Sequence, residues 1–230
     1  MALKSVFLPN PVPDSDRLRI SGDEHHHLTV GRVGVGEVVE VLDGNGGVWT
    51  AEVVDVTRKE TDVRVVEKRH VQRSGPEIIL AISLIKASAF ELAVEKAVEV
   101  GVTRLIPVIA HRSNLTTSRR LDRWTRIVVE AAKQSKRYYL PPIDEPAKFE
   151  YVLDLPAATK IVFAERGGGP LKSALAGSPA LCLVGPEGGW TDPELEMARL
   201  KGFHLVGLGE TILRSETAAI VGVALLRYEL

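Results

Sequence analysis

Two glycine-rich segments, each directly after an apolar run, are the part of this sequence best suited to binding a ligand. They read LVGPEGGW at residues 183–190 and LVGLGETILRSETA at residues 205–218. Glycine adopts positive φ angles and lets a ligand approach the main chain closely. Both segments lead into predicted helix starts, where free N–H groups point outward. Because ligands of open parallel sheets bind beyond the carboxyl ends of strands, the two segments predict a ligand site, one able to bind a flat neutral group such as adenine.

Familiar motifs do not account for these glycines. GPEGG lacks both the G-x-G-x-x-G spacing of dinucleotide-binding folds and the Lys-Ser/Thr of a P-loop. The sequence has no G-x-S-x-G nucleophile elbow, and its single cysteine, Cys182, lies inside an apolar strand. Taken alone, GPEGG is equally compatible with a plain turn from a strand into a helix.

The elements around these segments predict two domains. Residues 1–72 form an all-β region, in which 38–42 and 48–56 flank the turn-forming DGNGG and 61–71 supply another strand. The short spacing favours a small barrel or sandwich. Residues 73–77, with a Gly-Pro pair, form the predicted linker.

Residues 78–230 alternate between strands and helices, which predicts an α/β domain with a parallel sheet. Capping boxes are predicted at Ser88 with Glu91 and at Thr191 with Glu194. The strands are expected at 78–85, 104–110, 160–165, 180–185 and 204–209, and the helices at 90–100, 121–135, 192–201 and 215–230.

Charge is unevenly distributed along the chain. The net charge is −1, but residues 111–140 hold eight basic and two acidic residues, so that segment is +6 and the remainder is −7. Such a local excess indicates a polyanionic partner, although a solvated helix face is the alternative. Helical spacing places one row on a single face, namely Arg119, Arg123, Arg126, Glu130, Lys133 and Arg137.

The composition of the chain argues against several classes of protein and of binding site. One cysteine excludes an intrachain disulfide and a thiolate zinc site, so a reducing, cytoplasmic setting is expected. We find no apolar run of membrane-spanning length and no secretory h-region at the start. Three consecutive histidines, residues 25–27, are not expected to bind a metal, because neighbours on a strand point to opposite faces. Packing or RNA contact is the expected role.

The two glycine segments together closely resemble signature motifs of the SPOUT methyltransferases, and more narrowly of the family that methylates N3 of a uridine in 16S ribosomal RNA. Residues 84–113 resemble that family's first catalytic-domain motif, residues 123–143 its basic helix, and residues 23–46 its N-terminal PUA-like barrel. The likeness covers nearly the whole chain and is most specific around Arg214. Two departures are Lys4 in a start that is often arginine-rich, and Lys133 in place of a glutamate.

The resemblance implies an α/β catalytic domain with a deep trefoil knot behind a small all-β PUA-like barrel. It also implies S-adenosyl-L-methionine as the methyl donor, with no metal. The residues implied to bind that cofactor are Gly185, Glu187, Gly188 and Gly189 on one side and Leu208, Gly209, Ile212, Leu213, Arg214, Thr217 and Ala218 on the other.

Two residues are candidates for catalysis. The guanidinium of Arg214 could stabilise negative charge on a uracil that has lost its N3 proton. An ion pair with Glu216 or Glu210 is the alternative for this arginine. Glu216 is a conceivable base, but acidic residues are favourable in any first helical turn.

The implied partners are 16S ribosomal RNA, with uridine 1498 as the target, and a second copy of the chain. The residues implied to contact RNA are Arg119, Arg123, Arg126, Lys133, Arg137, His27 and Arg32. A homodimer packed through the knotted domain agrees with the C-terminal helix, 215–230, which is apolar almost all round and needs cover. Methylation of another RNA nucleotide and a non-catalytic RNA-binding or ribosome-assembly role are the alternatives.

Overall fold

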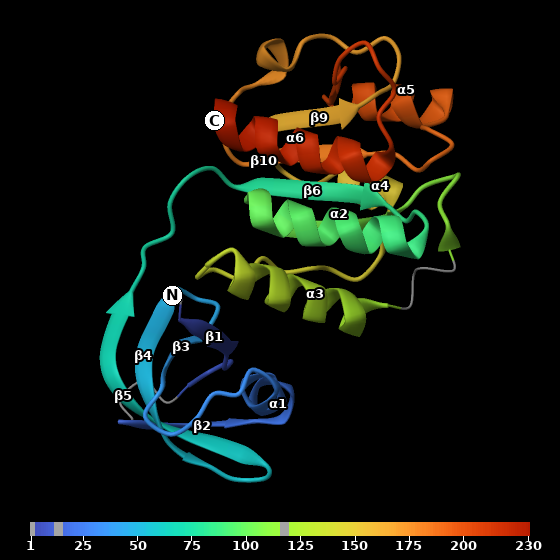
Figure 1. The fold of residues 1–230 in the computed structure, drawn as a ribbon. Coiled ribbons are helices and arrows are strands. Elements are labelled where there is room, and N and C mark those ends of the chain that lie inside the picture. Colours follow the sequence, from blue (N-terminus) through green and yellow to red (C-terminus); the bar gives the residue numbers. More distant parts are fainter. Residues whose placement is uncertain (1–2, 12–15, 116–119) are drawn as a thin grey trace. The chain divides into compact units, whose positions relative to one another are not determined.

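The computed structural model describes residues 3–11, 16–115 and 120–230, and the chain divides into two compact units (Figure 1). The first unit comprises Met1–Ser74 and Ala132–Leu140, and the second comprises Gly75–Ala131 and Pro141–Leu230. Each unit encloses its own cluster of buried apolar side chains. The helices in the described part of the chain are all too short or too polar to cross a membrane.

A five-stranded mixed sheet forms most of the first unit. Its strand order is β1-β3-β4-β5-β2, with β1 parallel to β3 and the other neighbours antiparallel. The predicted hairpin is confirmed, and its turn is closed by Asp43, whose Oδ1 accepts from the Asn45 and Gly47 amides at 2.7 and 2.8 Å. The elements are β1 Lys4–Phe7, β2 Arg17–Ser21, α1 Gly22–Val30, β3 Val38–Leu42, β4 Gly47–Val56 and β5 Glu60–His70.

The helix α1 was missed by the prediction of an all-β region. It carries the three histidines, so the argument from strand alternation was wrong for them. His25 is buried, with Nδ1 2.9 Å from the Thr61 hydroxyl, whereas His26 and His27 are exposed. Leu28, one turn on from His25, enters the same core, and α1 contacts the two edge strands β1 and β2. His25 is therefore a core residue that anchors the helix.

Two ion pairs attach the segment Ala132–Leu140 to the rest of the first unit, one to the sheet and one to α1. Lys136 Nζ lies 2.8 Å from a Glu40 carboxylate oxygen and 2.7 Å from the Ser5 hydroxyl. Burial alone would raise the pKa of Glu40, but hydrogen bonds and charge from Lys136, with help from Ser5 and Arg69, lower it below its ordinary value.

Lys133 forms the second of these pairs. Its side chain is only 6% exposed, and Nζ donates to both carboxylate oxygens of Glu24 at 3.0 Å. If Lys133 turned outward to bind another group, the Glu24 carboxylate would lose its partner inside the protein. Breaking such a pair is costly in free energy. The prediction that Lys133 contacts RNA is therefore corrected, because its ammonium faces the interior of the first unit.

The second unit is built on a six-stranded sheet in which every pair is parallel, as predicted. Its strand order is β11-β9-β10-β6-β7-β8, and all five residues of the central strand β10 are buried. The elements are β6 Ile78–Ser83, α2 Ala87–Val100, β7 Arg104–Ile109, α3 Leu121–Gln134, β8 Ala147–Lys148, α4 Phe149–Leu153, β9 Thr159–Phe163, the 3-10 helix Leu171–Ala174, β10 Ala180–Val184, α5 Asp192–Leu200, β11 His204–Val206 and α6 Ser215–Glu229.

Helices cover both faces of this sheet, which explains why its inner strands are apolar on both sides. The helices α2 and α6 lie side by side on one face (Figure 1). Phe149 and Val152 of α4, with Ala198 of α5, pack with strand residues in the core on the other face. Cys182 lies in this interior, where burial raises the pKa of its thiol to about 12.

Among the predicted helix-end signals, Gly101 and the Thr191 box are confirmed, and the Ser88 box is wrong. Gly101 ends α2 in the left-handed conformation at φ 115°, and the capping box of Thr191 and Glu194 begins α5. The box predicted at Ser88 and Glu91 is absent from α2, which begins at Ala87 without a side-chain cap. Glu91 instead accepts hydrogen bonds from Arg123 of α3, so a tertiary ion pair replaces the predicted local cap.

Candidate functional site

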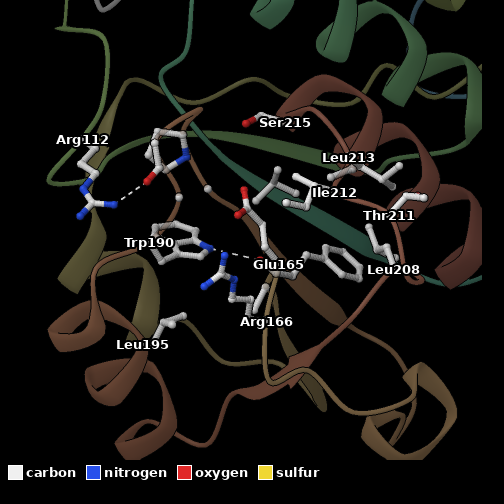
Figure 2. Close-up of a pocket in the computed structure, with 18 of the residues that line it drawn as sticks. Arg112, Glu165, Arg166, Trp190, Leu195, Leu208, Thr211, Ile212, Leu213 and Ser215 are labelled. Atoms are coloured by element: carbon white, nitrogen blue, oxygen red, sulfur yellow. Dashed lines mark hydrogen bonds between the residues drawn. The ribbon is translucent and has the colours of Figure 1, made fainter.

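Three neighbouring strands, β11, β9 and β10, end at the same edge of the parallel sheet, and the loops that follow them enclose a cavity of about 270 Å³ (Figure 2). The loop after β9 was not singled out from the sequence, although three glycines follow its strand at 167–169. These three glycines are the sequence signal that could have identified the loop. The cavity is lined by Arg112, Phe163, Ala164, Glu165, Arg166, Val184, Gly185, Pro186, Gly188, Gly189, Trp190, Asp192, Leu195, Leu208, Gly209, Thr211, Ile212, Leu213, Ser215 and Ala218.

Trp190 fixes the loop after β10. Its indole N–H donates to the Phe163 carbonyl at 3.3 Å, which ties this loop to the end of β9. The ring lies so close to Gly185 that a Cβ there would be 3.0 to 3.2 Å from indole atoms. The backbone must be bare at Gly185 so that the indole can pack against it.

The tip of the same loop is held from another element. Arg112, in the segment after β7, donates to the Gly188 carbonyl, and Gly189 turns the chain at φ 70°. Glu187 points elsewhere, since its Oε1 accepts from the Lys86 amide at 2.9 Å, directly before α2. The loop is therefore fastened at two points.

A second hollow adjoins this cavity through four shared residues, Glu165, Ile212, Leu213 and Ser215. Both predicted catalytic residues, Arg214 and Glu216, line this hollow, as does Glu187. Arg214 is the N-cap residue of α6, and its carbonyl accepts from the Ala218 amide at 2.8 Å. Its exposed side chain makes no hydrogen bond or ion pair with any described residue, so the alternative ion pairs with Glu216 and Glu210 are not formed.

The structure brings most of the predicted cofactor residues to one place. Eight of them line the cavity, namely Gly185, Gly188, Gly189, Leu208, Gly209, Ile212, Leu213 and Ala218. Glu187 and Arg214 line the adjoining hollow, and Thr217 lines neither. Sequence reasoning missed Glu165, Arg166, Arg112 and Trp190, which come from other strand ends or lie beyond the glycine motif.

The predicted basic row is divided between the two units. Arg123 and Arg126 belong to the second unit, whereas Lys133 and Arg137 belong to the first, and Arg119 lies outside the described residues. Arg123 donates from Nε and Nη2 to the Glu91 carboxylate, at 2.6 Å each, and this hydrogen bonding lowers the pKa of Glu91. Arg126 is exposed and has no such partner among the described residues.

The two RNA contacts predicted in the N-terminal region lie in the first unit. His27 is exposed on α1, and Arg32 is exposed in the following turn at φ 55°. The structure describes no cluster of three or more metal-binding side chains within residues 3–11, 16–115 and 120–230.

Known protein families account for both units. A model of the RNA methyltransferase domain matches residues 73–227, and a model of the RNA methyltransferase PUA domain matches residues 20–66. Fold, cavity and these matches define the class as an RNA methyltransferase domain preceded by a PUA domain.

Individual relatives narrow that class. The ribosomal RNA small subunit methyltransferase E of Synechocystis sp. is 35% identical over 97% of this chain and 77% of its own length. The enzyme of the same name from Rickettsia conorii is 29% identical over 99% of this chain and 96% of its own length. The enzyme of the same name from Neisseria gonorrhoeae, solved bound to S-adenosyl methionine, superposes with a TM-score of 0.92 at 28% identity, covering 99% of this chain and 98% of the other. The chain belongs to the ribosomal RNA small subunit methyltransferase E family.

The contact between Gly185 and Trp190 yields a stability prediction. Gly185→Ala should lower the free energy of unfolding by about 1–3 kcal/mol, the usual cost of overpacking, because the new methyl must displace the indole. Urea unfolding followed by fluorescence measures the change. Gly169→Ala is the control, since its Cβ would meet only the Leu205 carbonyl at 3.9 Å. Equal stability of both variants would show that the indole does not require a bare Gly185.

Proposed function

We propose that this chain transfers a methyl group from S-adenosylmethionine to N3 of a uridine in 16S ribosomal RNA, uridine 1498. One observation supports the proposal most directly: the two glycine loops, which follow β10 and β11 on either side of β9, enclose a cavity that adjoins a hollow lined by Arg214, whose side chain is unpaired among the described residues. The names of the relatives and the bound ligand of the Neisseria gonorrhoeae enzyme support it. A ribosomal substrate also favours a cytoplasmic location.

The cavity fits the adenosyl and methionyl parts of such a donor. Leu195, Leu208 and Leu213 offer apolar walls, and the glycine loops offer main-chain N–H and C=O groups to a neutral base. A Cβ on Gly209, at φ 119°, would meet nothing within 4 Å, so this backbone borders open space. When bound, S-adenosylmethionine supplies an activated methyl group. In this proposal the chain binds and orients it with the residues that line the cavity, namely Gly185, Gly188, Gly189, Leu208, Gly209, Ile212, Leu213 and Ala218.

Arg214 acts on the target base in this proposal. Loss of the N3 proton spreads negative charge over the two carbonyl oxygens of uracil. A guanidinium that pairs with no carboxylate of the described residues can stabilise this charge. Glu216 is the second catalytic candidate, in the first turn of α6.

The function is tested by adding the chain to small ribosomal subunits from a strain that lacks its own methylating enzyme. With S-adenosylmethionine present, mass spectrometry of the digested RNA should find 3-methyluridine at position 1498. Methyl groups on a different nucleotide would favour the first alternative. Calorimetry without detectable binding of S-adenosylmethionine at millimolar concentration would favour an RNA-binding or assembly factor.

Arg214→Ala should lower turnover by roughly 10²-fold or more, the scale for removing one donor to a developing oxyanion. Binding of S-adenosylmethionine should change little, because the donor occupies the glycine-lined cavity. Arg199→Ala is the matched control, since Arg199 is exposed on α5 and, among the described residues, pairs with Glu196 alone. If Arg214→Ala turns over nearly as fast as the control, Arg214 does not take part in catalysis.

We propose that Arg123, Arg126, Arg137, His27 and Arg32 contact RNA, together with Arg119. Arg126 is the most direct test because no described residue binds its side chain. Arg126→Ala should weaken RNA binding and reduce the slope of log affinity against log salt by about one unit. Filter binding at several salt concentrations measures this, with Arg199→Ala as control. An unchanged slope would leave Arg126 on a solvated helix face.

We further propose that the chain forms a homodimer through its second unit. Leu225 and Tyr228 of α6 are 37% and 86% exposed, and Leu92 of the adjacent α2 is 42% exposed. These exposed side chains lie on two helices that pack against each other and cover one face of the sheet. Sedimentation equilibrium at micromolar concentration should give a mass twice that of one chain. The Leu225→Glu variant should give the mass of a single chain. A monomeric wild-type mass contradicts the proposal.

A further inference from the structure

Glu165 is an acidic residue at the junction of the cavity and the hollow, and none of the roles assigned above involves it. It follows β9 by two positions, and it is the one charged residue that lines both spaces among the described parts of the chain. Figure 2 shows its side chain standing in the middle of the cavity, between Trp190 and the segment of Ile212 and Leu213. A group here lines the cavity between the glycine loops and also the hollow that Arg214 lines.

The backbone on both sides of Glu165 is held firmly. The Ala164 amide donates to the Val206 carbonyl at 3.0 Å, and the Phe163 carbonyl accepts from Trp190. Gly168 packs directly on β11, since a Cβ there would lie 2.3 Å from the Gly207 nitrogen. Hydrogen bonds and close packing therefore hold the main chain next to Glu165 against the end of β11 and the loop after β10.

The carboxylate of Glu165 has no bonding partner among the described residues. Glu165 makes no hydrogen bond or ion pair with the residues that the structure describes. One of its oxygens, Oε1, lies 4.0 Å from the place that a Cβ on Gly189 would occupy, so the carboxylate lies over the glycine loop. Such a charged group, rigidly mounted and without a structural partner, is available to a ligand.

The other acidic residues of the two spaces have structural explanations. Glu187 accepts from the Lys86 amide at 2.9 Å and so fastens its loop. Glu216 and Asp192 lie in the first turns of α6 and α5, where a helix dipole favours negative charge. Only Glu165 is left without a structural role among them.

The edge of uracil that must react has one donor between two acceptors, N3–H between two carbonyl oxygens. An arginine can bind an oxygen of this edge, and a carboxylate can accept the N3–H. Arg214 and Glu165 line the same hollow and offer this pair of groups. Resting on the function proposed above, we infer that Glu165 binds the N3–H of the target uracil and is the base that removes its proton.

The step balances as a direct displacement. The N3–H bond breaks and the proton passes to a Glu165 oxygen, while the nitrogen electron pair forms the new N3–CH₃ bond. The bond between sulfur and the methyl carbon breaks, and its electron pair stays on sulfur, which becomes a neutral thioether. Arg214 stabilises the charge on the uracil oxygen until the methyl group has transferred. A later exchange with water returns the proton on Glu165 to solvent.

Glu165→Gln tests this inference, because it preserves the shape of an exposed side chain and removes its basicity. Turnover should fall by about 10²–10⁴-fold, the range for general acid–base catalysis. The dissociation constant for S-adenosylmethionine, measured by calorimetry, should stay within about twofold. Glu196→Gln, a similarly exposed change on α5, is the matched control and should retain full turnover.

Two further readouts separate a base from a merely structural carboxylate. The Gln variant should gain rate about tenfold per pH unit through the alkaline range, because only uridine that has already ionised can react without the base. RNA carrying 5-fluorouridine, whose N3 proton is more acidic, should recover part of the lost rate in the variant. A structural role would give neither effect.

The possible results distinguish a wrong role for Glu165 from a wrong proposed function. If the wild-type chain forms no 3-methyluridine, the proposed function fails. If the wild type is active but Glu165→Gln keeps near-normal turnover, Glu165 is not the base. If the variant instead loses S-adenosylmethionine affinity in proportion to its rate, the carboxylate binds the positively charged cofactor, and the inference is overturned.

Discussion

Parallel pairing of β10, β9 and β11 is the constraint on which the site depends. Residues Ala180–Val184 of β10 pair in register with Thr159–Phe163 of β9, which in turn pairs with β11. Parallel strands deliver their carboxyl ends to one edge of a sheet, so three loops that are distant in sequence meet there. The interior supports this register, because the central strand is buried on both faces and a slip would expose its apolar side chains.

Glycine and tryptophan then shape the loops that meet at this edge. Trp190 packs on the bare backbone of Gly185 and donates to the carbonyl of Phe163, so a single side chain fixes two of the three loops. Gly168, in the loop after β9, allows that loop to approach the backbone of Gly207, where the third loop begins. The resulting enclosure is preorganised, and its charged groups, Arg214 and Glu165, remain unpaired among the described residues. Preorganised charge without internal partners is suited to stabilising charge that develops on a substrate.

The other ionic interactions of the chain serve structure, and this changes the meaning of its basic segment. Between residues 111 and 140 the sequence has an excess of positive charge. Glu24, Glu40 and Glu91, all from outside that segment, bind Lys133, Lys136 and Arg123 respectively. A count along the sequence therefore overestimates the charge that is free to attract a polyanion. The charge available to RNA is smaller and is carried by residues such as Arg126.

The sequence by itself determined the elements whose signals are local. The DGNGG turn and its strands, the stop of α2 at Gly101 and the Thr191 cap of α5 depend on neighbouring residues, and each was predicted correctly. Strand and helix alternation likewise predicted the parallel sheet, and the motifs around Gly185 and Arg214 predicted the family. Only the tertiary structure decided which side chains meet. Helix α1 forms because His25 and Leu28 find a core, Glu91 leaves its predicted cap for Arg123, and Glu165 joins Arg214 because β9 lies between β10 and β11. Such long-range choices depend on burial and on partners remote in the chain, which no local pattern encodes.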